Sequence, residues 1–189
     1  MEPVTCIVPA AGRSARMGQW KPLLPFRGST IIQTVVDVAV SVCTHVIVVT
    51  GYRGPELEAT LRGDSRLTLA ANPRWEDGMF SSIQCGVARM DTDHFFVVLG
   101  DKPFIRSEVY LSLLQAPRAN AVFPVFDGER GHPVLLDRIV REAVLAANPV
   151  TGSMPGLLSE LEVREVPWSD DSILRDVDTP EQYELARAP

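Results

Sequence analysis

A chain of 189 residues is long enough to bury a substantial core, and its length suits a single domain spanning residues 1–189. Because 46% of the residues are hydrophobic, the composition excludes a disordered chain. A formal net charge of -6 argues against a general nucleic-acid-binding protein, which presents a basic surface, but leaves room for one local basic pocket.

The cysteines and the apolar stretches argue against several other classes. Cys6, Cys43 and Cys85 are scattered and form no C-x-x-C pattern, so neither a zinc site nor a disulfide framework is expected. The N-terminus has no charged-then-apolar leader, and the most apolar stretch, residues 31–49, contains polar side chains such as Asp37 that a membrane span tolerates poorly. We therefore expect a cytoplasmic protein with neither a membrane nor a nucleic acid as its partner.

Apolar, strand-like segments alternate with helical patterns along the whole chain. This alternation predicts an α/β fold with a mostly parallel sheet and helices on both faces. The runs CIVPA, VIVVT and FFVVLG are continuously apolar, as central parallel strands are. The less regular stretch after Gly128 predicts a small antiparallel extension. In chain order the expected elements are strand 5–9, helix 31–42, strand 45–50, helix 54–62, strand 67–71, helix 81–90, strand 95–99, helix 107–115, strand 121–126, helix 138–146, strand 162–167 and helix 180–187.

A basic loop follows the first strand, within VPAAGRSARMGQWKPLLP. In an open parallel sheet, ligands bind beyond the carboxyl ends of the strands, which is where this loop lies. Gly12 and Gly18 let backbone N–H groups approach a phosphate, and Arg13, Arg16 and Lys21 add three cations. The loop is suited to bind a triphosphate, with the Lys21 ammonium next to the phosphate that is attacked in the reaction. The alternative is a mobile basic loop on the surface that binds nothing. The spacing matches neither the P-loop nor G-x-G-x-x-G, which argues against a Walker ATPase and a plain dinucleotide-binding oxidoreductase.

The stretch PAAGRSARMGQWKPLLP resembles the signature A-A-G-x-S-x-R-M-G-x-x-K-x-L-L-P of nucleotidyltransferases with a Rossmann-like fold. The branch it resembles contains molybdenum cofactor cytidylyltransferases and guanylyltransferases. The blocks NPRWEDGMFSSIQCGV, VVLGDKPFI, GHPVLL and DVDTPEQYELA extend this resemblance over nearly the whole chain. The resemblance implies a Rossmann-like nucleotidyltransferase fold and Mg²⁺-dependent chemistry. It implies that the nucleotide is bound by Ala10, Ala11, Gly12, Arg13, Ser14 and Lys21, and that the catalytic side chains are Arg13, Lys21 and Asp101.

Two of the matched blocks carry carboxylates suited to magnesium. Asp101 follows strand 95–99, where a carboxylate can hold a Mg²⁺ that bridges nucleotide phosphates; an ordinary turn aspartate is the alternative. Asp176 and Asp178 point the same way along a strand, and one of them could complete the metal shell. The resemblance favours Asp178, which could instead act as a negative charge at the start of the last helix, beside its capping residue Thr179.

Two further blocks concern the base and the acceptor. DGMFSSIQ places Gly78, Ser81 and Ser82 at a helix start, where N–H groups and hydroxyls can bind a base or ribose, or only cap the helix. The resemblance puts this block against the nucleobase, although relatives often have serine in place of Phe80. His132 of GHPVLL is expected in the acceptor pocket by resemblance, whereas an isolated histidine is more often structural.

The departures from the family pattern concern the substrates. Many cytidylyltransferases of this group have a G-D-x-G-A-R loop where this chain reads NPVTGSMPGLLSEL, so the pterin acceptor is left open. The guanylyltransferases usually read A-G-G in the first loop, and the side chain of Ala11 narrows the space near the base, which favours CTP. Lys102 stands at a position that varies in the family and is often glutamine, so no role is expected for it.

The expected function is Mg²⁺-dependent transfer of CMP from CTP to the terminal phosphate of molybdopterin, with release of pyrophosphate. The alternatives are transfer from GTP, another phospho-acceptor such as a sugar phosphate, and a non-catalytic nucleotide or cofactor carrier. A molybdoenzyme or its insertion chaperone is a candidate protein partner.

Overall fold

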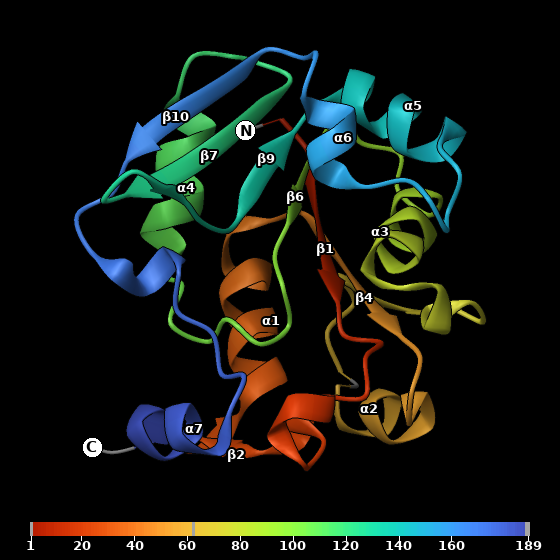
Figure 1. Ribbon diagram of the computed structural model, residues 1–189, viewed down its shortest axis with the longest axis vertical. Helices are drawn as coiled ribbons and strands as arrows, with labels where there is room; N and C mark the ends of the chain where they lie inside the picture. The colour runs from red at the N-terminus through yellow and green to blue at the C-terminus, as the bar shows by residue number, and fades with distance from the viewer. Residues whose placement is uncertain (1, 62, 188–189) are drawn as a thin grey trace.

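The computed structural model describes residues 2–61 and 63–187, and its main feature is a mixed sheet of eight strands (Figure 1). The strand order is β10-β7-β9-β6-β1-β4-β5, and β8 pairs with β7. The strands of this sheet are β1 (Val4–Pro9), β4 (His45–Thr50), β5 (Leu67–Ala71), β6 (His94–Val97), β7 (Ala121–Phe126), β8 (Glu129–Arg130), β9 (Val134–Leu136) and β10 (Val163–Pro167). The helices are α1 (Ile31–Val42), α2 (Gly54–Thr60), α3 (Met79–Val87), α4 (Ser107–Gln115), α5 (Arg138–Ala146), α6 (Met154–Leu158) and α7 (Pro180–Arg187).

Most of the strand pairs are parallel. β1 is parallel to β4 and β6, β4 is parallel to β5, and β7 is parallel to β10. Only β8 and β9 run the other way, and β9 lies between β6 and β7, antiparallel to both. The mostly parallel α/β fold and its small antiparallel part are therefore confirmed. The parallel strands all end at the same edge of the sheet, while β9 begins there.

Both faces of the sheet are covered, which explains the continuously apolar strands. Alternate residues of each central strand point to opposite faces. One set packs with α1, α2 and α4, and the other with α3, α5 and α6. In Figure 1, α1 and α4 lie on one side of β1, and α3 and α5 lie on the other. The first set includes Cys6, Val8, Val46, Val48 and Phe96, and the second includes Ile7, Ile47, Val49, Phe95 and Val97.

Several element ends differ from those expected. β6 ends at Val97, two residues early, where the chain turns so that Gly100 fits against Ile32 and Pro9. α3 begins at Met79 because Gly78, with φ 104°, already turns the chain into the helix. The last residue of the expected helix 54–62 lies outside the described residues. β8 and β9 form the antiparallel extension predicted after Gly128, whereas α6 and the hairpin of β2 (Pro25–Phe26) and β3 (Ser29–Thr30) were not expected from the sequence.

The C-terminal helix α7 packs near the first loop rather than on the main sheet. It shares a small apolar cluster with the β2–β3 hairpin, which includes Phe26, Val177 and Tyr183. Its start has the expected capping box: the Gln182 side chain accepts from Thr179 N, and the Thr179 hydroxyl accepts from Gln182 N. This packing brings the residues before α7 to the carboxyl edge of the sheet. No helix in the described ranges is long and apolar enough to cross a lipid bilayer.

Candidate active site

A cavity of about 350 Å³ opens where β1 and β6 end. Its walls come from four parts of the chain that are far apart in sequence. They are the loop after β1 with Gly12, Ser14, Arg16 and Lys21, the start of α3 with Met79, the turn at 99–101 after β6, and Asp178 before α7. This is the edge at which open parallel sheets bind their ligands.

The loop after β1 lines this cavity and has several backbone N–H groups left unpaired by the residues that the structure describes. Ser14 has a left-handed conformation with φ 57°, and its hydroxyl accepts a hydrogen bond of 3.2 Å from Lys21 N, which closes the loop. Within the described part of the chain, the N–H groups of Gly12, Arg13 and Ser14 donate to no protein acceptor. A run of free N–H groups next to cations is a typical anion-binding arrangement.

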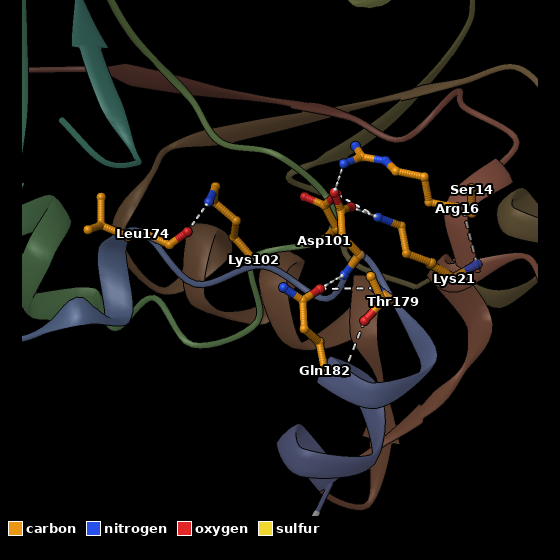
Figure 2. Close-up of polar contacts among 9 residues, drawn as sticks. Ser14, Arg16, Lys21, Asp101, Lys102, Leu174, Thr179 and Gln182 are labelled. Carbon is orange, nitrogen blue, oxygen red and sulfur yellow. Dashed lines mark hydrogen bonds and ion pairs between the residues drawn. The ribbon is translucent and has the colours of Figure 1, made fainter. Parts of the chain in front are cut away.

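Four charged side chains meet at the floor of the cavity. Lys21 Nζ lies 2.8 Å from Asp101 Oδ2 and 2.6 Å from Asp178 Oδ1, and Arg16 Nη1 lies 2.7 Å from Asp178 Oδ2. Figure 2 shows Arg16 and Lys21 reaching Asp101 and its surroundings from the same side. The Lys21 side chain is only 12% exposed, so its two ion pairs are shielded from water, whereas the Arg16 side chain is 79% exposed.

The environment fixes the charges of this cluster. Burial lowers the pKa of Lys21, but Asp101 and Asp178 outweigh it, so that the pKa is raised above its usual value. Burial raises the pKa of Asp178, but the hydrogen bond and charge of Lys21, with the charge of Arg16, bring it below its usual value. Lys21 is therefore a cation and Asp178 an anion at neutral pH.

The two carboxylates fit a divalent metal. Asp101 Oδ1 is buried and has no hydrogen-bond partner among the described residues, and such an oxygen calls for a ligand. No cluster of three or more His, Cys, Asp or Glu side chains suited to a metal occurs among residues 2–61 and 63–187. Mg²⁺ commonly binds to one or two carboxylates and takes its other ligands from phosphates and water. Asp101 and Asp178 provide such a donor pair.

Asp176 lies away from this cluster. It lines a separate cavity with Phe104 and Arg175, whose guanidinium stacks on the Phe104 ring at 3.9 Å. The structure therefore brings Asp178, and not Asp176, to Lys21 and Asp101.

A second cavity, of about 490 Å³, adjoins the first and shares Pro9, Gly12 and Met79 with it. Ala11, Gly78 and Ser82, three of the residues predicted to bind the nucleotide, line it, and we refer to it as the base-side cavity. Gly51 packs closely behind Ala11 and Trp75, since a Cβ on Gly51 would lie 2.8 Å from Ala11 Cβ and 2.7 Å from Trp75. Ala10 lines the first cavity instead, and its N–H donates to Val49 O.

The two loop arginines lie in different cavities. Arg13 lines the base-side cavity, where its guanidinium pairs with Glu76 and stacks over Trp75 at 4.8 Å. Arg16, rather than Arg13, lines the cavity that contains Lys21. Arg16 lies in the R-M-G part of the signature and is one of the three cations predicted for the triphosphate, but the resemblance did not name it among the individual ligands. Glu76 and Met79 also line these cavities, and no spacing signal in the sequence marks them.

The two serines of α3 also separate. Ser81 is buried, accepts from Asn72 Nδ2 at 2.9 Å and lies 2.9 Å from Arg74 O and 2.8 Å from Gly78 O. It thus supports the turn before α3. Ser82 also accepts from Asn72 Nδ2, at 3.1 Å, and lines the base-side cavity.

His132 lies in a third cavity, of about 410 Å³, which meets the first at Met79 and Leu99. It precedes β9, and because β9 runs against the other strands its start reaches the site edge. His132 Nδ1 lies 3.3 Å from Val97 O. Burial and the charge of Lys102 lower the pKa of His132 to about 4, so the ring is neutral at neutral pH.

Comparison with known proteins agrees with this geometry. Residues 6–164 match the MobA-like NTP transferase domain. The chain belongs to this family. It is a nucleotidyltransferase, and the resemblance read from its sequence blocks is confirmed at the level of the family.

This MobA-like transferase is similar over its whole length to proteins with different names. It is 32% identical over 187 residues to the molybdenum cofactor cytidylyltransferase of Escherichia coli K12, covering 99% of this chain and 97% of that one. It is also 32% identical over 197 residues to the nicotine blue oxidoreductase of Paenarthrobacter nicotinovorans, covering 95% and 94%. The crystal structure of Rv0371c from Mycobacterium tuberculosis H37Rv superposes with a TM-score of 0.84 at 25% identity, covering 98% of this chain and 97% of that one.

Proposed function

We propose that this MobA-like transferase transfers CMP from CTP to the terminal phosphate of molybdopterin and uses Mg²⁺. The observation that carries the proposal is the placement of Lys21 between Asp101 and Asp178, beside the free N–H groups of the loop. In this reaction an oxygen of the acceptor phosphate forms a bond to the α-phosphorus of CTP. The bond from that phosphorus to the β-phosphate oxygen breaks, and pyrophosphate leaves.

The residues of the cavity have separate tasks in this proposal. The N–H groups of Gly12 and Ser14, with Arg16, bind the triphosphate, and Lys21 neutralises the charge on the α-phosphate. Mg²⁺ held by Asp101 and Asp178 would supply further positive charge to the phosphates. No general base is needed, because the attacking phosphate is already ionised at neutral pH. Positioning and charge neutralisation account for the catalysis.

The base-side cavity supports CTP over GTP. Ala11, Gly78 and Ser82 line it, and the Ala11 methyl takes up space that a glycine at this position would leave free for a purine. Arg13 stays a predicted nucleotide ligand, and it must leave Glu76 before it can reach a phosphate. Ser81 contributes by holding the turn that contains Gly78.

The acceptor is proposed to lie in the third cavity, next to His132, whose neutral ring can exchange hydrogen bonds with it. The name of the Escherichia coli relative supports molybdopterin as this acceptor. The oxidoreductase name of the second relative is a reason to test the chemistry directly, since a shared fold does not fix the reaction. The proposal includes a cytoplasmic location and delivery of the product to a molybdoenzyme or its insertion chaperone.

The deciding experiment measures pyrophosphate release by the purified protein with Mg²⁺ and molybdenum-loaded molybdopterin, with CTP, GTP, ATP and UTP offered separately. We expect release with CTP alone. Asp101→Ala should reduce the rate by at least about 100-fold, because it removes a metal ligand. Asp37→Ala is the control for the loss of a carboxylate, since Asp37 is exposed on α1 and, among the described residues, accepts only from Gln33 Nε2 of the same helix, and it should retain the rate.

Other outcomes would change the proposal in defined ways. Release with GTP alone would overturn the choice of base. Binding of CTP without pyrophosphate release would point first to a different phospho-acceptor, such as a sugar phosphate. If sugar phosphates also fail, a carrier function replaces the enzyme.

A further inference from the structure

The segment that delivers Asp178 to the site has no regular secondary structure of its own. Residues 175–178 connect a short helical turn to α7, and they lie beyond residues 6–164, which match the family. Arg175 N donates to Asp171 O at 3.1 Å and Asp178 N to Gln182 Oε1 at 2.8 Å, both within the same stretch of chain. Val177 N donates to Asp101 O at 3.0 Å, and just before the segment His132 N donates to Ile173 O at 3.0 Å. These last two bonds join the region of the second carboxylate to the rest of the site.

A third contact comes from the side chain of Lys102. Lys102 Nζ donates to Leu174 O at 2.7 Å, and the residue is only 7% exposed. Figure 2 shows this side chain directed toward Leu174, whereas Asp101 faces Arg16 and Lys21. Two neighbouring residues of one turn thus make contacts in different directions. Asp101 contacts Lys21, and Lys102 binds the segment that leads to Asp178.

Stability alone does not explain a lysine at this position. Placing an ammonium group in the interior carries a desolvation cost, and apolar side chains of similar size are often as stable or more stable in such places. The charges of Asp101, Asp176 and Asp178 act on the ammonium, so it lies in the field of the carboxylates it helps to arrange. A function of Lys102 in the site would explain both its buried charge and its hydrogen bond to Leu174 O.

We infer that Lys102 is a positioning residue for the metal–nucleotide site. Its bond to the Leu174 carbonyl keeps the segment 174–178 against the turn after β6, so that Asp178 stays next to Asp101. The two carboxylates then act as one pair toward a divalent metal and Lys21. This inference rests on the proposed function, because it assumes that CTP and a divalent metal bind in this cavity.

Lys102→Met tests the inference, because methionine keeps the apolar length and removes the donor and the charge. The dissociation constant of CTP is measured by calorimetry with Mg²⁺ and again with a chelator, without acceptor, so that no turnover is involved. The strengthening by Mg²⁺ is the ratio of the CTP dissociation constant with chelator to that with Mg²⁺. In the variant this ratio should fall about tenfold, while the dissociation constant without metal stays within about twofold of that of the wild type. The melting temperature should stay the same or rise.

Two further variants separate positioning from general structural support. Lys102→Gln retains an N–H donor and should recover most of the strengthening by Mg²⁺. Arg141→Met is the matched control: Arg141 Nη2 donates to Met90 O at 2.7 Å, another contact between a cation and a carbonyl, on α5. It should lower the melting temperature and leave the strengthening by Mg²⁺ unchanged.

The possible failures are distinguishable. The positioning role is wrong if Mg²⁺ strengthens CTP binding by Lys102→Met as much as by the wild type. It is also wrong if the variant has a lower melting temperature and binds CTP more weakly by the same factor with and without Mg²⁺. If wild-type protein binds CTP equally well with and without Mg²⁺, the proposed function fails, and the inference fails with it.

Discussion

His132 is a histidine that the fold keeps neutral. Its pKa falls to about 4, chiefly because the ring is buried and also because the Lys102 charge acts on it. In the unfolded chain the same ring has a pKa near 6.5. Between these two values the unfolded state binds more protons than the folded state. The contribution of His132 to stability is therefore complete above pH 6.5 and is lost as the pH falls toward 4.

This difference predicts a pH-dependent free energy of unfolding. Between pH 7 and pH 4.5 the wild-type protein should lose roughly 2 kcal/mol that His132→Gln does not lose. Urea unfolding curves of both proteins at the two pH values measure the effect. Equal losses in the wild type and the variant would show that His132 takes up its proton in the folded protein without penalty.

For single residues, the sequence predicted which side chains belong to the site better than it predicted where each of them lies. The signature predicted that Lys21 and Asp101 belong to one site, and the structure brings them within 2.8 Å of each other. It did not separate Arg13 from Arg16, because their placement depends on Glu76 and Trp75, about 60 residues away. Contacts between distant segments leave no local pattern in the sequence.

Among the elements, α3 makes the tightest contact with the sheet. Gly86 faces β1 so closely that a Cβ would lie 2.6 Å from Ile7 Cγ2 and 3.1 Å from Val49 Cγ2. The same helix carries Ser82 at its first turn, and Gly78 precedes it. The spacing between α3 and β1 therefore also sets the width of the base-side cavity.

Gly86→Ala should force α3 away from the sheet and lower the free energy of unfolding by about 1–3 kcal/mol. Urea unfolding measures the loss. Ile7→Ala removes the contacted methyl group and is destabilising by itself. The double variant Gly86→Ala/Ile7→Ala should therefore be less destabilised than the sum of the two single variants. Additive losses would mean that the helix does not press on Ile7.

The sequence predicted the long elements and missed the short ones. The apolar runs of β1, β4 and β6 carried a clear signal because both of their faces are buried. β9 has three residues and α6 has five, too few for a periodic pattern.

Two departures from the family pattern lie in contact. Phe80 is one of them, and Gly152 of the altered loop approaches it so closely that a Cβ on Gly152 would lie 2.6 Å from the Phe80 ring. Such a pairing of two departures becomes visible only in three dimensions.

At the scale of the whole molecule, the candidate site joins segments that are separated by most of the chain. Lys21 and Asp178 are 157 residues apart in sequence and their charged atoms are 2.6 Å apart. A ligand that bridges these segments binds the folded state only, and it therefore stabilises the whole fold.

Binding of CTP with Mg²⁺ should therefore raise the melting temperature. At a ligand concentration of about 100 times the dissociation constant, the gain is about 2.7 kcal/mol, or roughly 5–10 °C for a protein of this size. Addition of a chelator should remove most of the shift, because the carboxylates then repel the triphosphate. Differential scanning fluorimetry measures it, and GTP serves as the comparison. An equal shift with GTP would contradict the selection of a pyrimidine by the base-side cavity.

The reversed strand β9 joins two parts of the main sheet, which also meet where α5 packs on α3. The pairs Phe95↔Leu136, Phe96↔Leu135 and Val97↔Val134 join a half that contains the loop after β1 to a half that contains His132 and α6. Protein engineers could therefore treat residues 120–167 as a replaceable cassette. Exchanging it for the corresponding part of a relative, with the β6–β9 register kept, should change which acceptor is used while the choice of nucleotide is inherited from the unchanged half.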